Sequence, residues 1–73
     1  MSNYICWLVT VLDDTELIKC ALKVNRDYLT GDCAEYPLEW ENRIQIHKLL
    51  PLHVQSCGPI VAIEKISEVE VVN

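Results

Sequence analysis

The pattern of apolar and polar residues in the first third of the chain predicts two strands joined by a tight turn. Residues Tyr4–Leu12 are rich in aromatic and β-branched side chains, which favour strands. In Leu17–Val24 the apolar residues recur at every second position and Lys19 and Lys23 have the opposite parity, which indicates a half-buried strand. Acidic residues that suit a turn lie between the two segments. We expect a β-hairpin whose first strand, apolar on both faces, is central.

The middle of the chain combines a loop signal with an ambiguous segment. Asn25–Tyr36 predicts a loop, because it contains the turn signal Thr30-Gly31-Asp32 and because Pro37 favours an extended residue before it. From position 38 to position 47 the apolar residues are even-numbered and the charged ones odd-numbered. This alternation favours a β interpretation of Leu38–Leu50, with a reversal near residues 41–43. A helix over Leu38–Leu50 is the alternative.

The last third predicts a short helix followed by extended segments. Pro51 is tolerated in a first helical turn and Gly58 suits a C-terminal cap, so a short helix or helical turn is expected between them. Ile60–Ile63 and Val69–Val72 are strand-like. Glu64–Glu68, which joins them, is expected to form a tight connection or a bulge.

Together these segments predict a mainly β fold with at most one short helix, or an α+β fold if Leu38–Leu50 is helical. The strands would form a small antiparallel sheet or a partly open barrel, built on the N-terminal hairpin. The face of the second strand that carries Ile18, Leu22 and Val24 must be covered by the rest of the chain. No linker or change of composition divides residues 1–73, so a single small globular domain is expected.

The net charge of the chain limits the classes of partner that it is expected to bind. The formal net charge is −5, from 6 Lys and Arg against 11 Asp and Glu, and the cations are scattered. Nucleic-acid backbones and anionic membranes are therefore disfavoured as partners, whereas a basic protein surface is favoured. The apolar run of residues 5–12 is too short to span a bilayer and lacks a basic segment before it, so we expect a cytoplasmic protein.

The four cysteines, Cys6, Cys20, Cys33 and Cys57, lack the close spacing of zinc or redox motifs. We expect them to be reduced and to act as small buried apolar residues. A zinc site formed by Cys33, His53 and Cys57 is geometrically conceivable as an alternative.

The sequence contains no pattern that indicates catalysis. A phosphate-binding glycine loop and a Ser-His-Asp signature are both missing, and we expect no enzyme activity, no cofactor and no catalytic or metal-binding residue. Trp7 and Trp40 could stack on nucleic-acid bases, but Trp40 is flanked by Glu39 and Glu41. Packing in the core is the expected role of both tryptophans.

The two ends of the chain resemble Sm-like small barrels. The resemblance rests on the strand–acidic turn–strand order at the beginning and on IVAIEKISEVEVV at the end, where a short turn would join the last two strands. It implies an RNA-binding small barrel, although the basic and aromatic positions of the nucleotide pocket have no counterpart here.

The whole chain also resembles very small phage-encoded regulators of host RNA polymerase, through its 73 residues, its acidic charge and its lack of catalytic motifs. This resemblance implies a non-catalytic protein of the host bacterial cytoplasm that binds RNA polymerase, inhibits transcription initiation and causes antitermination. An acidic nucleic-acid mimic that inhibits a host defence nuclease is an alternative, since five acids and no base lie between positions 27 and 41.

The candidate partner-binding residues are Asp27, Asp32 and Glu35. They lie in the longest predicted loop, where binding residues concentrate, and their charge would steer a basic partner. An exposed strand edge is a second surface to which a partner could add a strand. We expect a monomer in the absence of the partner.

Overall fold

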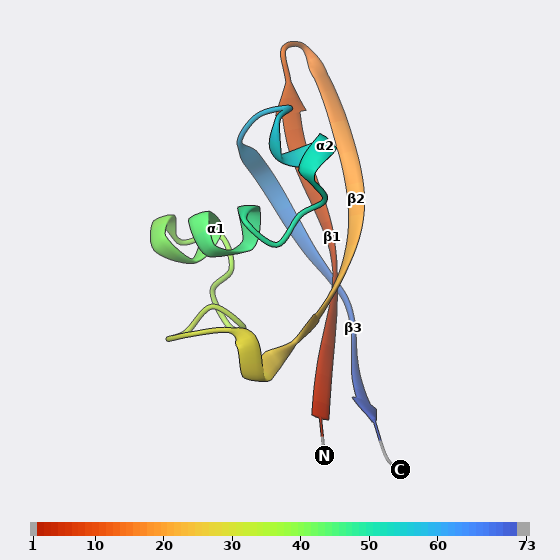
Figure 1. Cartoon of the computed structure of the whole chain (residues 1–73), viewed down its shortest axis with the longest axis vertical. Helices are drawn as coiled ribbons and strands as arrows, with labels where there is room; N and C mark the ends of the chain where they lie inside the picture. The colour runs from red at the N-terminus through yellow and green to blue at the C-terminus, as the bar shows by residue number, and fades with distance from the viewer. Residues whose placement is uncertain (1, 72–73) are drawn as a thin grey trace.

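The computed structural model describes residues 2–71, which fold into a three-stranded antiparallel sheet with short helices on one face. The strands are β1 (Ser2–Asp13), β2 (Glu16–Asn25) and β3 (Ile60–Val71), in the spatial order β2-β1-β3 (Figure 1). The small antiparallel sheet, the N-terminal hairpin and the central place of the first strand are confirmed. Asp14 closes the hairpin turn with φ 54°, a left-handed conformation that Asp tolerates better than most residues.

One face of β1 forms the centre of the core and is called the inner face. It carries Ile5, Trp7, Val9 and Val11, each with no more than 1% of its surface exposed. The register sets these residues opposite Val24, Leu22, Cys20 and Ile18 of β2. Buried Ile46, Leu50 and Val54 from the helical region complete this cluster. The fold is therefore a two-layer structure in which the helical region covers one side of the sheet.

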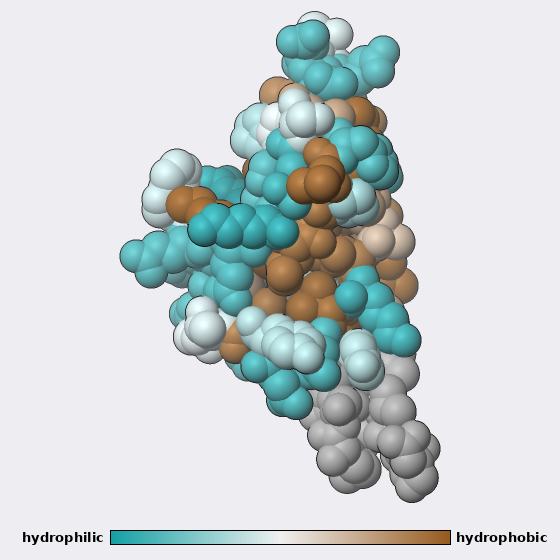
Figure 2. Space-filling model, viewed as in Figure 1, coloured by the Kyte–Doolittle hydropathy of each residue, from teal (hydrophilic) through white to brown (hydrophobic). Residues whose placement is uncertain are grey.

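The helical region does not fully cover the inner face of β2 at the free edge of the sheet. Val24 is buried, but Ile18 and Leu22 are only half-buried, so the predicted core face of the hairpin is covered only in part. Figure 2 shows apolar side chains reaching the surface between the helices and β2. Since the cost of a truncation scales with burial, Leu22 contributes less to stability than a fully buried leucine would.

The β interpretation of Leu38–Leu50 is wrong, because this segment contains the helix α1 (Trp40–His47). The alternation of apolar and charged residues predicted the wrong structure because two of the apolar residues, Trp40 and Ile44, are exposed, while Asn42 is buried. Ile46 alone among the apolar residues of α1 is buried against the sheet. The helical alternative is therefore confirmed, and the fold remains mainly β.

The short helix expected after Pro51 is present as a single turn, α2 (Leu52–Gln55), but Gly58 does not cap it. The C-cap is Ser56. Gly58 instead lies against the end of β1, where a Cβ atom at this position would overlap the carbonyl oxygen of Leu12. The absence of a side chain at position 58 thus allows the chain to return to the sheet, and the Leu12 amide donates to the Pro59 carbonyl at 3.0 Å.

The final strand is continuous, so the predicted tight connection at Glu64–Glu68 is wrong and the predicted bulge is confirmed. Cys6 pairs with Ser67 and Trp7 with Lys65, which leaves Ile66 as an extra residue in β3. A second irregularity leaves Val61 extra near the start of β3. Bulges of this kind increase strand twist, which Figure 1 shows where β1 and β3 cross. Val72 lies outside the described residues.

A loop with a 3-10 turn, η1 (Arg26–Tyr28), joins β2 to α1, in the region where a loop was predicted. Asn25 caps this turn through Oδ1, which accepts from the Asp27 amide at 2.9 Å. Within residues 2–71, none of the helices has the length and apolar character that crossing a membrane requires.

Candidate protein-binding surface

Helix α1 holds the loop of residues 29–39 through a buried amide side chain, and we call this segment the acidic loop. Asn42 is 7% exposed, and its Nδ2 donates to Oδ1 of Asp32 at 2.8 Å and to the Tyr36 carbonyl at 2.9 Å. A buried amide has to be paired to offset its lost hydration, and these two bonds pair it. The carboxylate of Asp32 is therefore part of the loop's anchor, although this residue itself is exposed.

A second side chain of α1 fastens the beginning of the same loop. Gln45 accepts from the Thr30 amide through Oε1 at 3.0 Å, and its Nε2 donates to the Thr30 hydroxyl at 3.1 Å. Gly31 follows with φ 62°, the left-handed conformation that glycine adopts without strain. The loop thus has a defined shape, and the carboxylate of Asp32 is held against α1.

The predicted site residues are all exposed, but they do not form one equivalent cluster. Asp32 and Glu35 lie around the buried Cys33: burial raises the pKa of the Cys33 thiol, and the charges of Asp32 and Glu35 raise this pKa further. Asp27 lies in the separate turn η1. Glu35 and Asp27 are thus candidates for contacting a partner, whereas Asp32 also has a structural role.

An apolar groove that the sequence did not reveal lies between α1 and β3. Its volume is about 320 Å³, and its exposed apolar walls are Trp40, Ile44 and Val61, which are 69%, 42% and 46% exposed. Pro59 and Ile60 also line the groove. Val61 is the extra residue of the irregularity near the start of β3. We refer to the surface formed by Trp40, Ile44 and Val61 as the Trp40 groove.

Arg43 and His47 of α1 also line the Trp40 groove. The guanidinium carbon of Arg43 lies 5.6 Å from the centre of the Trp40 ring, within the range of a cation–π contact. His47 is half-buried, and its Nε2 lies 3.0 Å from the Gly58 carbonyl oxygen. The first contact orients the indole and the second joins α1 to the segment that leads into β3.

Core packing is confirmed for Trp7 and wrong for Trp40. Trp7 is 1% exposed at the centre of the sheet, whereas Trp40 is 69% exposed at the first position of α1. The signal that could have separated them is local: Trp7 lies within a continuous apolar run, and Trp40 lies between Glu39 and Glu41.

The four cysteines are free thiols. Cys33 is buried and the other three are half-buried, so the expectation of burial is fully met only at Cys33. Cys57 donates through its Sγ to the His53 carbonyl at 3.2 Å. Among the described residues, no three His, Cys, Asp or Glu side chains are grouped so as to hold a metal ion.

This arrangement, an apolar groove beside an anchored acidic loop, is suited to binding another macromolecule. No protein family, no curated protein and no solved structure was found that matches the chain.

Proposed function

We propose that this chain is a non-catalytic regulator that binds bacterial RNA polymerase in the cytoplasm of the host, inhibits transcription initiation and causes antitermination. The observation that supports protein binding most directly is the exposed indole of Trp40 in an apolar groove. The resemblance to phage-encoded regulators supports the choice of polymerase as the partner.

The Trp40 groove supplies the apolar part of the interface. Tryptophan and arginine are the residue types that most often dominate binding energy, and here Arg43 lies over the Trp40 ring. Burying a ring that is 69% exposed removes apolar surface from water without disturbing the core. A partner would insert an apolar side chain between Trp40 and Val61.

The exposed acidic residues between positions 27 and 41 supply steering. Asp27, Glu35, Glu39 and Glu41 are exposed, and no Lys or Arg lies between positions 27 and 41. A partner that carries basic residues around an apolar anchor complements this surface. Exposed charges act mainly on the rate of encounter, so the affinity should fall as salt rises.

The experiment is a binding titration with purified bacterial RNA polymerase, paired with promoter-dependent transcription. Trp40→Ala should weaken binding by about tenfold or more, which is the usual size of a hot-spot loss. Leu52→Ala is the matched control, because Leu52 is an exposed apolar residue outside the Trp40 groove. Equal affinities of the two variants would overturn the assignment of the groove.

The charge contribution is tested by a triple variant, Asp27→Asn, Glu39→Gln and Glu41→Gln, which keeps shape and spares the anchoring Asp32. Its association rate should fall and lose most of its salt dependence. A pull-down from a bacterial lysate that recovers a nuclease in place of polymerase subunits would favour the nucleic-acid-mimic alternative. Binding of RNA in a low-salt filter assay would favour the Sm-like alternative.

A further inference from the structure

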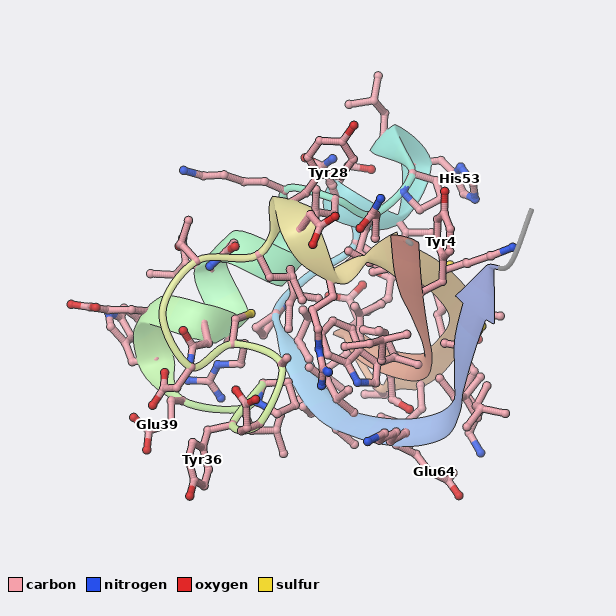
Figure 3. All side chains as sticks on the ribbon, turned by 90° about the horizontal axis from the view of Figure 1, so that it is seen from below. Tyr4, Tyr28, Tyr36, Glu39, His53 and Glu64 are labelled. Carbon is pink, nitrogen blue, oxygen red and sulfur yellow. The ribbon has the colours of Figure 1, made fainter. Side chains whose placement is uncertain are left out.

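The face of the sheet opposite the helices is a second surface, which we call the outer face. Tyr4, Cys6, Leu8 and Leu12 of β1 are half-buried there, and none of them belongs to the core cluster on the inner face. Figure 3 shows α1 and the preceding loop on the other side of the sheet and Glu64 projecting away from them. Thr10, on the same face, is 8% exposed, whereas Tyr4, Cys6, Leu8 and Leu12 form an apolar strip that keeps part of its surface open to solvent.

The charges along the outer face are divided between its two edges. Lys19 and Lys23 are exposed on β2 and pair with Thr10 and Cys6, which places both lysines on the outer face. Glu64 is exposed on β3 and pairs with Leu8. One edge of the outer face is therefore positive and the opposite edge is negative, with the apolar strip between them.

The register also fixes the levels of these charges along the strands. Leu8 lies between Ala21 of β2 and Glu64 of β3, so these three residues form one row across the sheet. Lys19 and Lys23 lie two residues to either side of Ala21. Glu64 is thus level with the midpoint between the two lysines, on the opposite edge.

We propose that the outer face binds a second copy of this chain, related by a two-fold axis that runs parallel to β1 between the two sheets. This rotation keeps each row at its level and exchanges the edges. Glu64 of each copy then lies over Ala21 of the other copy, between Lys19 and Lys23. Leu8 meets its own equivalent on the axis, so the apolar strips cover one another.

Other arrangements of two copies bring like charges together. A two-fold axis that lies between the two sheets but runs perpendicular to β1 would place the lysine edge of one copy over the lysine edge of the other. Pairing of two copies along their free β2 edges would also bring lysines together. Pairing along the free edge of β3 meets its two irregularities and the charge of Glu64. The two-fold axis parallel to β1 is therefore the arrangement that the charges select.

The packing of the outer face agrees with this geometry. Ala21 and Ala62 flank Leu8 and Thr10 in the register, and their short side chains allow a second sheet to approach. Facing sheets pack about 10 Å apart with their strands within about 30° of each other. In this dimer α1 and the Trp40 groove point outward in both copies. The proposal goes beyond the proposed function, does not depend on it, and replaces the monomer expected from the sequence.

The test is sedimentation equilibrium over a range of protein concentrations at low salt, where exposed ion pairs are least screened. The mass should rise with concentration from 8.4 kDa to twice that value. The Lys19→Glu and Lys23→Glu double variant, and Glu64→Lys alone, should each raise the dissociation constant about tenfold or more. The chain carrying all three substitutions should dimerise again, because the complementarity is restored with reversed signs.

Lys48→Glu is the control, since Lys48 is an exposed lysine that follows α1 on the other side of the sheet. This variant should dimerise as the unmodified chain does, and circular dichroism should show that every variant is folded. A mass of 8.4 kDa at all concentrations would overturn the proposal. Failure of the three substitutions to restore the dimer would also overturn it, as would a dimer that only Trp40→Ala dissociates.

Discussion

Trp7 and Trp40 are the same residue in two contrasting regions of the molecule. Trp7 lies at the centre of the sheet with 1% of its surface exposed, and Trp40 lies at the start of α1 with 69% exposed. The first region is held by the regular register between β1 and β2, and the second by side-chain hydrogen bonds from α1 to a loop. The contrast indicates that the inner face of the sheet and the helical residues packed on it provide stability, while the exposed side of α1 presents a surface that stability does not require.

The largest expected effect is at the centre of the sheet. Trp7→Ala should lower the free energy of unfolding by about 3–5 kcal/mol, because it removes a large buried side chain and leaves a cavity. Small domains have about 5–15 kcal/mol in total, so this variant should be close to unfolded. Urea denaturation measures the loss, and a change below 1 kcal/mol would break the contrast between the two tryptophans.

The next effect is at the junction between the two regions. Gly58→Ala should lower the free energy of unfolding by about 1–3 kcal/mol, because its Cβ overlaps the Leu12 carbonyl oxygen and forces the backbone to move. Gly31→Ala is the comparison, since no atom lies near the added Cβ at that position and only the left-handed φ opposes the change. If Gly58→Ala melts no lower than the unmodified protein, the chain does not return to the sheet as described.

A smaller effect is expected in the anchor of the acidic loop. Asn42→Ala removes two hydrogen bonds and should cost about 1–2 kcal/mol, because Asp32 can recover part of its pairing from water. Amide hydrogen exchange should increase in residues 30–36 and stay unchanged in β1. Faster exchange throughout the sheet would show that the two regions are not separable.

The smallest effect is a pH dependence that arises from Cys33. Its pKa is raised above its ordinary value in the folded chain, first by burial and then by Asp32 and Glu35, so folding favours the protonated thiol. This contribution is complete below the unfolded pKa and is lost as pH rises from about 9 through the folded value. Thermal melts from pH 8 to pH 10.5 should fall less steeply for Cys33→Ala. Equal slopes for the two proteins would contradict this assignment.

The sequence predicts the sheet far better than it predicts the helical layer. The alternation in Leu17–Val24 predicts the strand correctly, because successive residues of a strand point to opposite faces of the sheet and the residues on one face share one environment. The same alternation in Leu38–Leu50 arises from exposed Trp40 and Ile44, whose exposure follows from the way α1 packs on the sheet and not from the spacing of apolar residues. The predicted bulge in β3 succeeds because charged residues interrupt an otherwise apolar strand there.

The candidate site shows the same division. Asp27, Asp32 and Glu35 could be selected from charge and loop position alone, and all three are exposed. The role of Asp32 as an anchor depends on Asn42, ten residues away, and so could not be read from the loop itself. The Trp40 groove depends on α1 lying beside β3, a tertiary contact that neither segment encodes alone.

The central claim is that the exposed indole of Trp40 binds a protein partner and contributes little to the fold. The most direct test is to measure, for Trp40→Ala, both the thermal midpoint and the affinity for purified bacterial RNA polymerase. We expect a midpoint within a few degrees of the unmodified protein, since this side chain is 69% exposed, together with a loss of affinity of about tenfold or more. Unchanged affinity, or a loss of binding that is matched by unfolding, would contradict the claim.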